Sequence, residues 1–244
     1  MNFDFKKIEK EKIEEIKDLK EDRSLIAAIE KAKKAGIIPI IAEVKKSSPS
    51  KGKIRDIEHI EAANSMEKGG ACILSVLTDK NFDGKVCYLR QVKGAVKLPV
   101  LRKDFIVDMF QLYESRGNGA NAVLLIAALL KDKTTEYVDK AHELGMGALV
   151  EVHGEEDLGY ALSSGARLIG INNRDLKTLK VELGTTERLA PKIPKDRIIV
   201  AESGINNVED IRRLQKVGAT AFLVGTSIMS TPDIEKKVRE LTGR

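Results

Sequence analysis

The feature that most constrains this chain is a regular alternation of short apolar segments with longer amphipathic ones. The short segments are rich in Ile, Val, Leu and Ala and end in turn residues, which predicts strands buried on both faces. Such strands are expected at 38–43, 72–76, 98–101, 122–126, 147–151, 168–171, 197–201 and 221–224. The stretches between them carry apolar residues at helical spacing, and several end in glycine, as helices often do. These strand–helix units predict parallel strands joined by helical crossovers.

Two architectures use such units, a closed barrel and an open doubly wound sheet. The chain has 244 residues, which is close to the roughly 250 of a (β/α)8 barrel. No GxGxxG turn follows the first strand, as it does in open dinucleotide-binding sheets. We therefore predict an α/β fold, a single (β/α)8 TIM barrel domain over residues 1–244. Residues 1–36 are expected to form an N-terminal helical extension, with one helix over 3–20 and a second from Ser24 to a stop at Gly36.

Composition favours a small anionic ligand over a macromolecular partner. The 42 basic and 37 acidic residues are interspersed, and only 4% of residues are aromatic. A nucleic-acid surface would gather basic residues and offer aromatic rings for stacking. No run approaches the roughly 18 apolar residues of a membrane span, and the Lys- and Glu-rich start has no apolar signal segment. We expect a cytoplasmic protein, a monomer or weak homodimer, with no nucleic-acid or membrane partner.

Polar and charged residues follow the predicted strands at their carboxyl ends. They are Glu43 and Lys45, Lys103, Glu151, Asn172 and Arg174, Glu202 and Ser203, and Gly225 and Thr226. One charged strand end is usually a surface ion pair, but in a barrel all of these ends converge on one face. Two lysines beside several carboxylates suit acid–base chemistry. The sequence therefore predicts an active site at this end of the barrel.

Glycines after the last two strands predict a phosphate site. Gly204 and Gly225 each open a turn, where backbone N–H groups can face an anion, with the Ser203 and Thr226 hydroxyls beside them. The alternative is that both glycines only make tight turns. The histidines are not expected to take part: His153 is expected to point away from Glu151 and to serve at the start of a helix, and His59 is expected to be exposed. Cys72 and Cys87 lack metal or disulfide spacing, so no metal is expected.

Six segments in this order resemble those of indole-3-glycerol phosphate synthases, and the likeness runs from about residue 24 to the C-terminus. The segments are AEVKKSSPSKG (42–52), LSVLTD (74–79), PVLRKDFI (99–106), LVEVH (149–153), IGINNRDL (169–176) and VAESGI (200–205). The resemblance implies a carboxy-lyase of tryptophan biosynthesis. Its substrate would be 1-(2-carboxyphenylamino)-1-deoxyribulose 5-phosphate, closed to indole-3-glycerol phosphate with loss of CO2 and water.

The resemblance also implies roles for individual residues. Lys103 would be the general acid on the ribulose carbonyl and Glu151 the general base of the later dehydration. Lys45 would pair with the anthranilate carboxylate and share the acid role. The remaining catalytic residues, which would orient the lysines and the sugar hydroxyls, are Glu43, Asn172 and Glu202. Those that would surround the phosphate or its approach are Ser48, Arg174, Ser203, Gly204, Gly225 and Thr226. Phe105 and Leu124 are expected as apolar walls around the arene, and no cofactor is expected.

Three alternatives remain open at this point, and one of them is a class I aldolase-type Schiff base at Lys103. A sibling phosphate-binding barrel such as phosphoribosylanthranilate isomerase would share the glycine turns, but an Amadori rearrangement needs no lysine pair beside a carboxylate on the fifth strand. A basic anion- or nucleic-acid-binding protein is the alternative that is not an enzyme, and it rests only on the net charge of +5.

Overall fold

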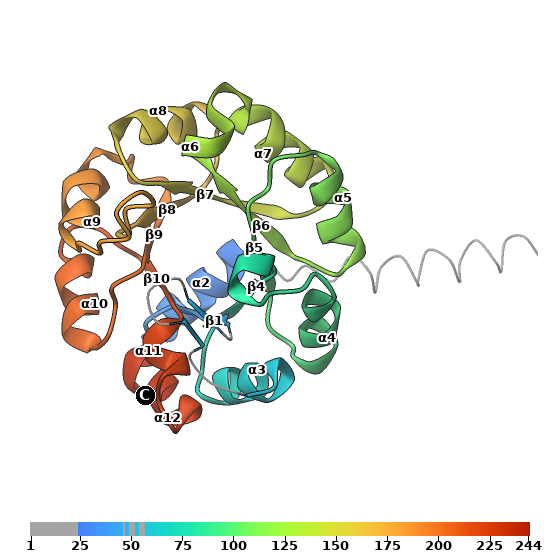
Figure 1. Cartoon of the computed structure of the whole chain (residues 1–244). Helices are drawn as coiled ribbons and strands as arrows, with labels where there is room; N and C mark the ends of the chain where they lie inside the picture. Colours follow the sequence, from blue (N-terminus) through green and yellow to red (C-terminus); the bar gives the residue numbers. More distant parts are fainter. Residues whose placement is uncertain (1–23, 46, 49–51, 54–56) are drawn as a thin grey trace, which may run out of the picture.

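The computed structural model describes residues 24–45, 47–48, 52–53 and 57–244. Eight parallel strands form a closed barrel, in which β1 pairs with both β4 and β10 (Figure 1). The strands are β1 (Ile40–Val44), β4 (Ile73–Leu77), β5 (Val100–Lys103), β6 (Ala122–Ile126), β7 (Gly147–Val152), β8 (Leu168–Asn172), β9 (Ile198–Glu202) and β10 (Ala221–Val224). The predicted (β/α)8 barrel is confirmed, and every predicted strand is present with small shifts at its ends.

Helices alternate with these strands and surround them (Figure 1). They are α3 (His59–Lys68), α4 (Cys87–Ala95), α5 (Phe110–Gly117), α7 (Thr134–Glu143), α8 (Glu155–Ser163), α9 (Gly184–Leu189), α10 (Val208–Gln215) and α12 (Ile234–Thr242). Shorter elements that the sequence did not predict are the antiparallel pair β2 (Ser47–Ser48) and β3 (Gly52–Lys53), the helices α6 (Ala127–Leu130) and α11 (Thr226–Met229), and the 3-10 turns η1 (Lys80–Phe82), η2 (Lys131–Lys133) and η3 (Ala190–Lys192).

Side chains alternate between the two faces of each strand and build two separate apolar clusters. One cluster lies between the strands and the outer helices and includes Leu74, Val150 and Ala201. The other fills the barrel interior with Ile41, Ile73, Leu101, Leu149 and Val200. Two residues further along β1, β5, β7 and β9, the same inner row continues with Glu43, Lys103, Glu151 and Glu202. The barrel interior is therefore apolar in the layer nearer the amino-terminal ends of the strands and charged at their carboxyl-terminal ends.

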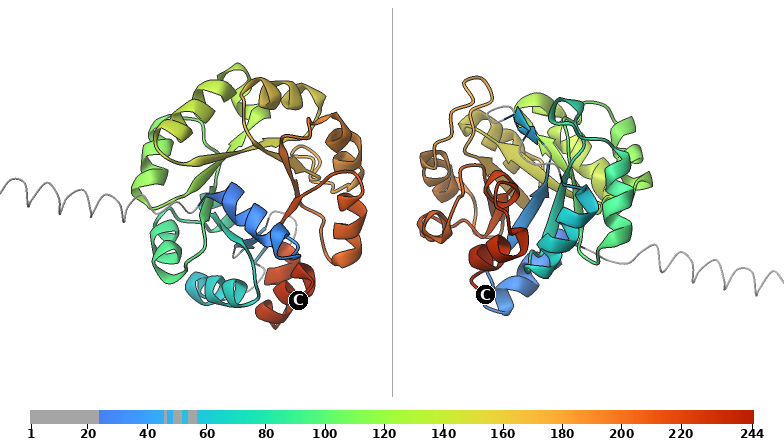
Figure 2. Two further views of the ribbon diagram at one scale, coloured as in Figure 1. Left: turned by 180° about the vertical axis from the view of Figure 1, so that it is seen from behind. Right: turned by 60° about the horizontal axis from the view of Figure 1, so that its bottom comes forward.

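The helix α2 (Leu25–Lys34) covers the opposite, amino-terminal end of the barrel. The Ser24 hydroxyl accepts a hydrogen bond from the Ala27 N–H group at 3.4 Å, which is the predicted N-cap. Leu25 and Ile29 pack into the interior cluster with Ile41 and Ile73. In the view from behind, α2 lies across the barrel opening (Figure 2). The helix predicted over 3–20 lies outside the described residues.

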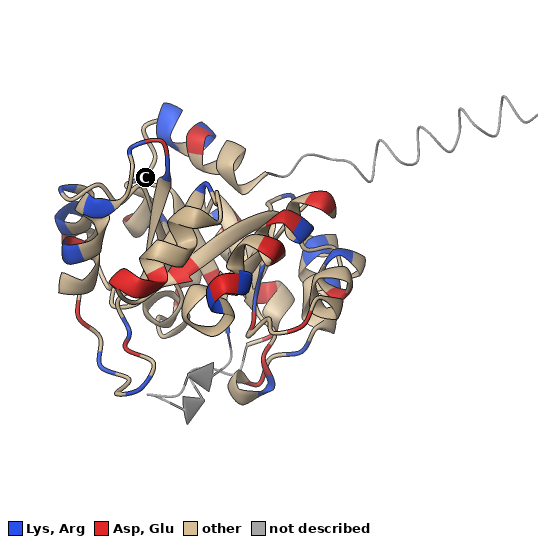
Figure 3. Cartoon of the chain, turned by 90° about the horizontal axis from the view of Figure 1, so that it is seen from above, with Lys and Arg blue, Asp and Glu red and all other residues tan. Residues whose placement is uncertain are grey.

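Charges of both signs are interspersed along the outer helices in the view of Figure 3. Several form pairs on the surface, such as Arg213 with Glu187 at 2.7 Å and Arg239 with Glu235 at 2.8 Å. In the part of the chain that the structure describes, no helix combines the length and the apolar character that crossing a membrane requires.

Candidate active site

A pocket of about 630 Å³ opens at the carboxyl-terminal end of the barrel, a volume typical of small-molecule sites. Apart from Ser48, every residue that the sequence predicted for the site lines this pocket. These residues are Glu43, Lys45, Lys103, Phe105, Glu151, Asn172, Arg174, Glu202, Ser203, Gly204, Gly225 and Thr226. Ser48 lies in β2, and its side chain is outside the described part of the structure.

Lys103 stands at the centre of the charged residues in the pocket. Its Nζ lies 3.4 Å from Oε2 of Glu151 and 3.7 Å from Oε2 of Glu202. Both carboxylates are 1% exposed, whereas the lysine side chain is 18% exposed and faces the pocket. The three residues come from β5, β7 and β9, so the closed sheet brings them together across the barrel interior.

Burial and charge act in opposite directions on this group. Burial alone favours neutral Lys103, but the charges of Glu151, Glu202 and Glu43 outweigh it and raise the pKa of the lysine. Burial likewise opposes ionisation of Glu151, but Lys103, together with a hydrogen bond and charge from His153, keeps the pKa of this carboxyl below its usual range. At neutral pH the pair is therefore an ammonium facing a carboxylate.

Glu202 behaves differently from the other two buried carboxyls. Burial and the neighbouring charge of Glu151 raise the pKa of Glu202 well above its ordinary value, against the opposing charge of Lys103. Neither carboxyl oxygen has a hydrogen-bond partner among the described residues. Gly170, in the next strand, makes room for the group, because a Cβ atom there would collide with Oε1 of Glu202. This role of Gly170 was not predicted from the sequence.

Glu43 and Lys45 form a second pair on the β1 side of the pocket. Oε1 of Glu43 lies 2.8 Å from Nζ of Lys45. Burial opposes ionisation of Glu43, but Lys45 and Lys103 lower the pKa of this carboxyl. Gly225 passes close by, since a Cβ atom there would lie 2.5 Å from Oε1 of Glu43 and 3.0 Å from Nζ of Lys45.

The turn after β9 is bent sharply at Ser203 and Gly204. Both have positive φ angles, 64° and 81°, and for a serine this conformation is uncommon. Asn173 holds the turn, since its Nδ2 group donates to the carbonyls of Glu202 at 3.0 Å and Ser203 at 3.1 Å. A Cβ atom at Gly204 would lie 2.6 Å from Val181, so this turn leaves no room for a side chain there. The sequence did not predict the contribution of Asn173.

The remaining wall of the pocket is apolar. Leu124 lines it as predicted, and Phe105 stands at the rim with its ring 6.5 Å from that of Phe82. The sequence missed Phe82 and the leucines of the loop after β8, Leu176 and Leu179, which also line the pocket. Leu176 and Leu179 are 44% and 41% exposed. Single leucines in a loop form no periodic apolar pattern, so the sequence does not mark them as pocket residues.

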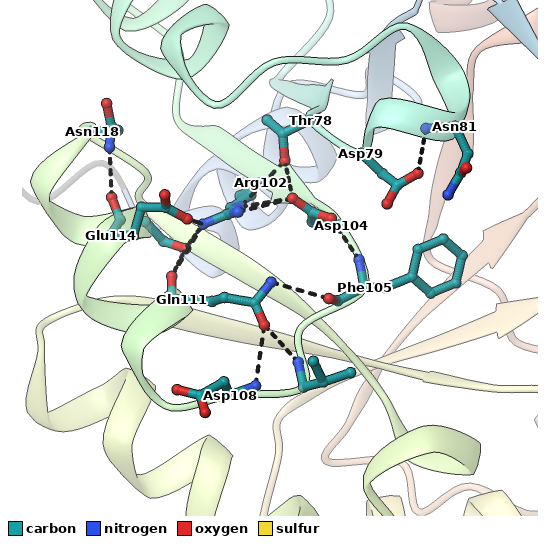
Figure 4. Close-up of polar contacts among 12 residues, drawn as sticks. Thr78, Asp79, Asn81, Arg102, Asp104, Phe105, Asp108, Gln111, Glu114 and Asn118 are labelled. Carbon is teal, nitrogen blue, oxygen red and sulfur yellow. Dashed lines mark hydrogen bonds and ion pairs between the residues drawn. The ribbon is translucent and has the colours of Figure 1, made fainter.

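A buried arginine network lies behind Lys103 and was also missed (Figure 4). Arg102 is 2% exposed and pairs with Asp104 and Glu114, each at 2.8 Å. Its Nε group also donates to the Thr78 hydroxyl at 3.2 Å. Gln111 completes the network, because its side chain accepts from Val107 N–H at 2.8 Å and donates to the Phe105 carbonyl at 3.1 Å. The network ties together both chain segments that flank Lys103.

Two predictions about histidines are wrong. His153 does not point away from Glu151: residues two apart at a strand end share a face, and Nε2 of His153 lies 3.2 Å from Oε1 of Glu151. His59 is buried, 7% exposed, and stacks on Tyr88 with ring centroids 4.2 Å apart. Within the described ranges, no group of His, Cys, Asp and Glu is arranged to hold a metal ion.

Comparison with known proteins identifies the family. A family model described as indole-3-glycerol phosphate synthase matches residues 4–241. An indole-3-glycerol phosphate synthase from Caldanaerobacter subterraneus subsp. tengcongensis is 49% identical over 212 residues, which cover 85% of this chain and 83% of the relative. One from Acetivibrio thermocellus is 48% identical over 211 residues, covering 85% and 81%.

A solved structure shares the fold alone. Thiamine phosphate pyrophosphorylase from Pyrococcus furiosus superposes with a TM-score of 0.61 at 17% identity, covering 84% of this chain and 93% of that one. The family model spans the residues that line the pocket described above, and the two relatives each cover 85% of this chain. The chain belongs to the indole-3-glycerol phosphate synthase family.

Proposed function

We propose that this pocket closes the indole ring of 1-(2-carboxyphenylamino)-1-deoxyribulose 5-phosphate, with Lys103 as general acid and Glu151 as general base. The products are indole-3-glycerol phosphate, CO2 and water. The observation that carries the proposal is the position of Lys103, whose ammonium group faces the pocket while Glu151 and Glu202 lie within 3.4 and 3.7 Å behind it.

The first step forms the carbon–carbon bond. The arene carbon that bears the carboxylate attacks the ribulose carbonyl carbon, and negative charge develops on the carbonyl oxygen. An ammonium group held in a partly dry pocket stabilises that charge and donates the proton. The raised pKa of Lys103 supports this role, because it keeps the ammonium form fully populated before the substrate arrives. Loss of the carboxylate as CO2 then restores the aromatic ring.

The second step removes water. The hydroxyl made from the carbonyl leaves after it is protonated, and a proton is taken from the neighbouring carbon that is bonded to nitrogen, which completes the pyrrole double bond. Glu151 is the base, since its carboxylate is buried and ionised beside Lys103. Lys45 shares the acid role, and Glu43 at 2.8 Å orients it.

The two anionic groups of the substrate have separate places in this proposal. Lys45 pairs with the anthranilate carboxylate. The phosphate lies against the turns after β9 and β10, beside Ser203, Gly204, Gly225 and Thr226, which all line the pocket. The arene lies against Leu124 and Phe105. Asn172 and Arg174 complete the polar side, and Ser48 is proposed for the phosphate approach from the family resemblance alone.

The enzyme is proposed to work in the cytoplasm as a monomer or weak homodimer on this small substrate, with no nucleic-acid or membrane partner. Cys72 and Cys87 are free thiols, which suits a reducing compartment. Sedimentation at several protein concentrations tests the oligomeric state, and a stable tetramer would contradict it.

Indole fluorescence tests the function directly. Purified protein is mixed with the carboxyphenylamino-deoxyribulose phosphate without added metal, and the indole product is followed over time. We expect turnover that a Glu151→Gln variant lacks. Conversion of phosphoribosylanthranilate instead would favour the sibling isomerase.

A further inference from the structure

A histidine outside the pocket lies against the buried carboxylate of Glu151. Nε2 of His153 is 3.2 Å from Oε1 of Glu151, while Oε2 of the same carboxylate is 3.4 Å from Nζ of Lys103. The two oxygens of Glu151 therefore face different partners. His153 is not among the residues that line the pocket, so any influence on the reaction passes through Glu151.

The start of α8 fixes the histidine in place. The backbone N–H group of His153 donates to Oδ2 of Asp157 at 2.9 Å, and the same oxygen lies 3.8 Å from the ring nitrogen Nδ1. Asp157 is in the first turn of α8. The backbone of His153 is thus held by the Asp157 carboxylate, while the ring faces Glu151. The side chain is only 15% exposed.

The contact with Glu151 determines where the imidazole carries a proton. A neutral imidazole has one donor and one acceptor nitrogen. An acceptor at Nε2 would set its lone pair against a carboxylate oxygen, so a stable contact at this distance requires a proton on Nε2. The ionisable groups around the pair are Lys103 from β5, Glu43 from β1, Glu202 from β9 and Asp157 from α8. None of these four residues is substituted in the His153 variants described below.

We propose that His153 is a positioning residue for Glu151. Its Nε2–H group donates to Oε1 and leaves Oε2 turned toward Lys103 and the pocket, as the oxygen that takes the substrate proton. A carboxylate held at one oxygen cannot rotate away from that alignment, and misplacement of a catalytic group costs rate more than binding. This inference rests on the proposed role of Glu151 as general base.

Two substitutions at position 153 distinguish an effect on the position of Glu151 from an effect on the stability of the fold. His153→Leu removes the donor but fills similar space, whereas His153→Gln offers an amide N–H group at the same reach. We expect kcat of the leucine variant to fall by about 10- to 100-fold, the effect of losing a hydrogen bond to a charged group, with KM changed less than about threefold. The glutamine variant should retain kcat within about threefold of wild type. His142→Gln, on the exposed side of α7, is the matched control.

The assays are run beside wild type and Glu151→Gln, and thermal unfolding of each variant is recorded. If wild type forms no indole product, the proposed function fails and not this inference alone. If Glu151→Gln is inactive while folded His153→Leu keeps wild-type kcat, the positioning role is overturned. Equal loss of kcat in the leucine and glutamine variants also contradicts it, because the hydrogen bond then does not matter. Glutamine, which resembles histidine in polarity, keeps the test decisive if leucine unfolds the protein.

Discussion

Lys103 and Glu151 are carried by strands that do not pair with each other, yet Nζ of the lysine lies 3.4 Å from Oε2 of the glutamate. β6 separates β5 from β7, so the contact is made across the barrel interior. Closure of the sheet, rather than a local turn, sets this distance. Side chains that shape the interior at the same level should therefore affect the pair without touching the substrate.

Gly170→Ala tests that expectation. A Cβ atom at this position collides with the Glu202 carboxyl group, so Glu202 must shift from its place 3.7 Å from Lys103. We expect a loss of about 1–3 kcal/mol in unfolding free energy and a fall in kcat of more than about tenfold. Gly147→Ala is the matched control in a neighbouring strand, because its Cβ would lie 3.4 Å from that of Ala122, an ordinary contact. Equal effects of the two substitutions would refute the steric explanation.

Arg102→Met tests the network behind Lys103. The change leaves Asp104 and Glu114 without the buried guanidinium that pairs with them at 2.8 Å. Removing one partner of a buried ion pair costs about 3–5 kcal/mol, which urea unfolding measures. Arg102→Lys should recover part of this loss, since it keeps the charge without the planar fork. Arg213→Met, which breaks the exposed pair with Glu187, should cost less than about 1 kcal/mol. A similar cost for both methionine variants would contradict the account.

The pH dependence of stability tests the state of Glu202. The folded protein raises the pKa of this carboxyl above its ordinary 4.5, so the folded state holds a proton that the unfolded chain releases. The unfolding free energy contributed by Glu202 is therefore greatest at low pH and falls as pH rises through the folded pKa. Glu202→Gln is neutral at every pH and should remove that fall.

We therefore expect Glu202→Gln to gain stability relative to wild type as pH rises from about 4.5 to about 8. The lowered pKa values of Glu43 and Glu151 act in the opposite direction, since their stabilisation is lost as pH falls. That contribution is present in both proteins and largely cancels in the difference. A difference in unfolding free energy that does not change with pH would show that Glu202 is ionised in the folded state.

The barrel could be predicted from the sequence because its strands are buried on both faces. They therefore appear as short runs of apolar residues that can be recognised without knowledge of the tertiary structure. The sequence also predicted which side chains meet, because parallel strand ends in a barrel converge wherever the strands lie. The one-turn helices α6 and α11 were not predicted, since four residues are too few to show a helical period. Arg102 escaped because its partners Thr78 and Glu114 lie on other elements. The contact of His153 with Glu151 could have been predicted, because residues two apart along a strand lie on the same face.

The most direct test is the turnover of Lys103→Met, followed by indole fluorescence with the carboxyphenylamino-deoxyribulose phosphate. Methionine has a similar length but cannot donate a proton, so we expect kcat to fall by about 10²- to 10⁴-fold while circular dichroism shows an intact fold. Near-normal turnover in a folded Lys103→Met protein would contradict the assignment of Lys103 as the general acid.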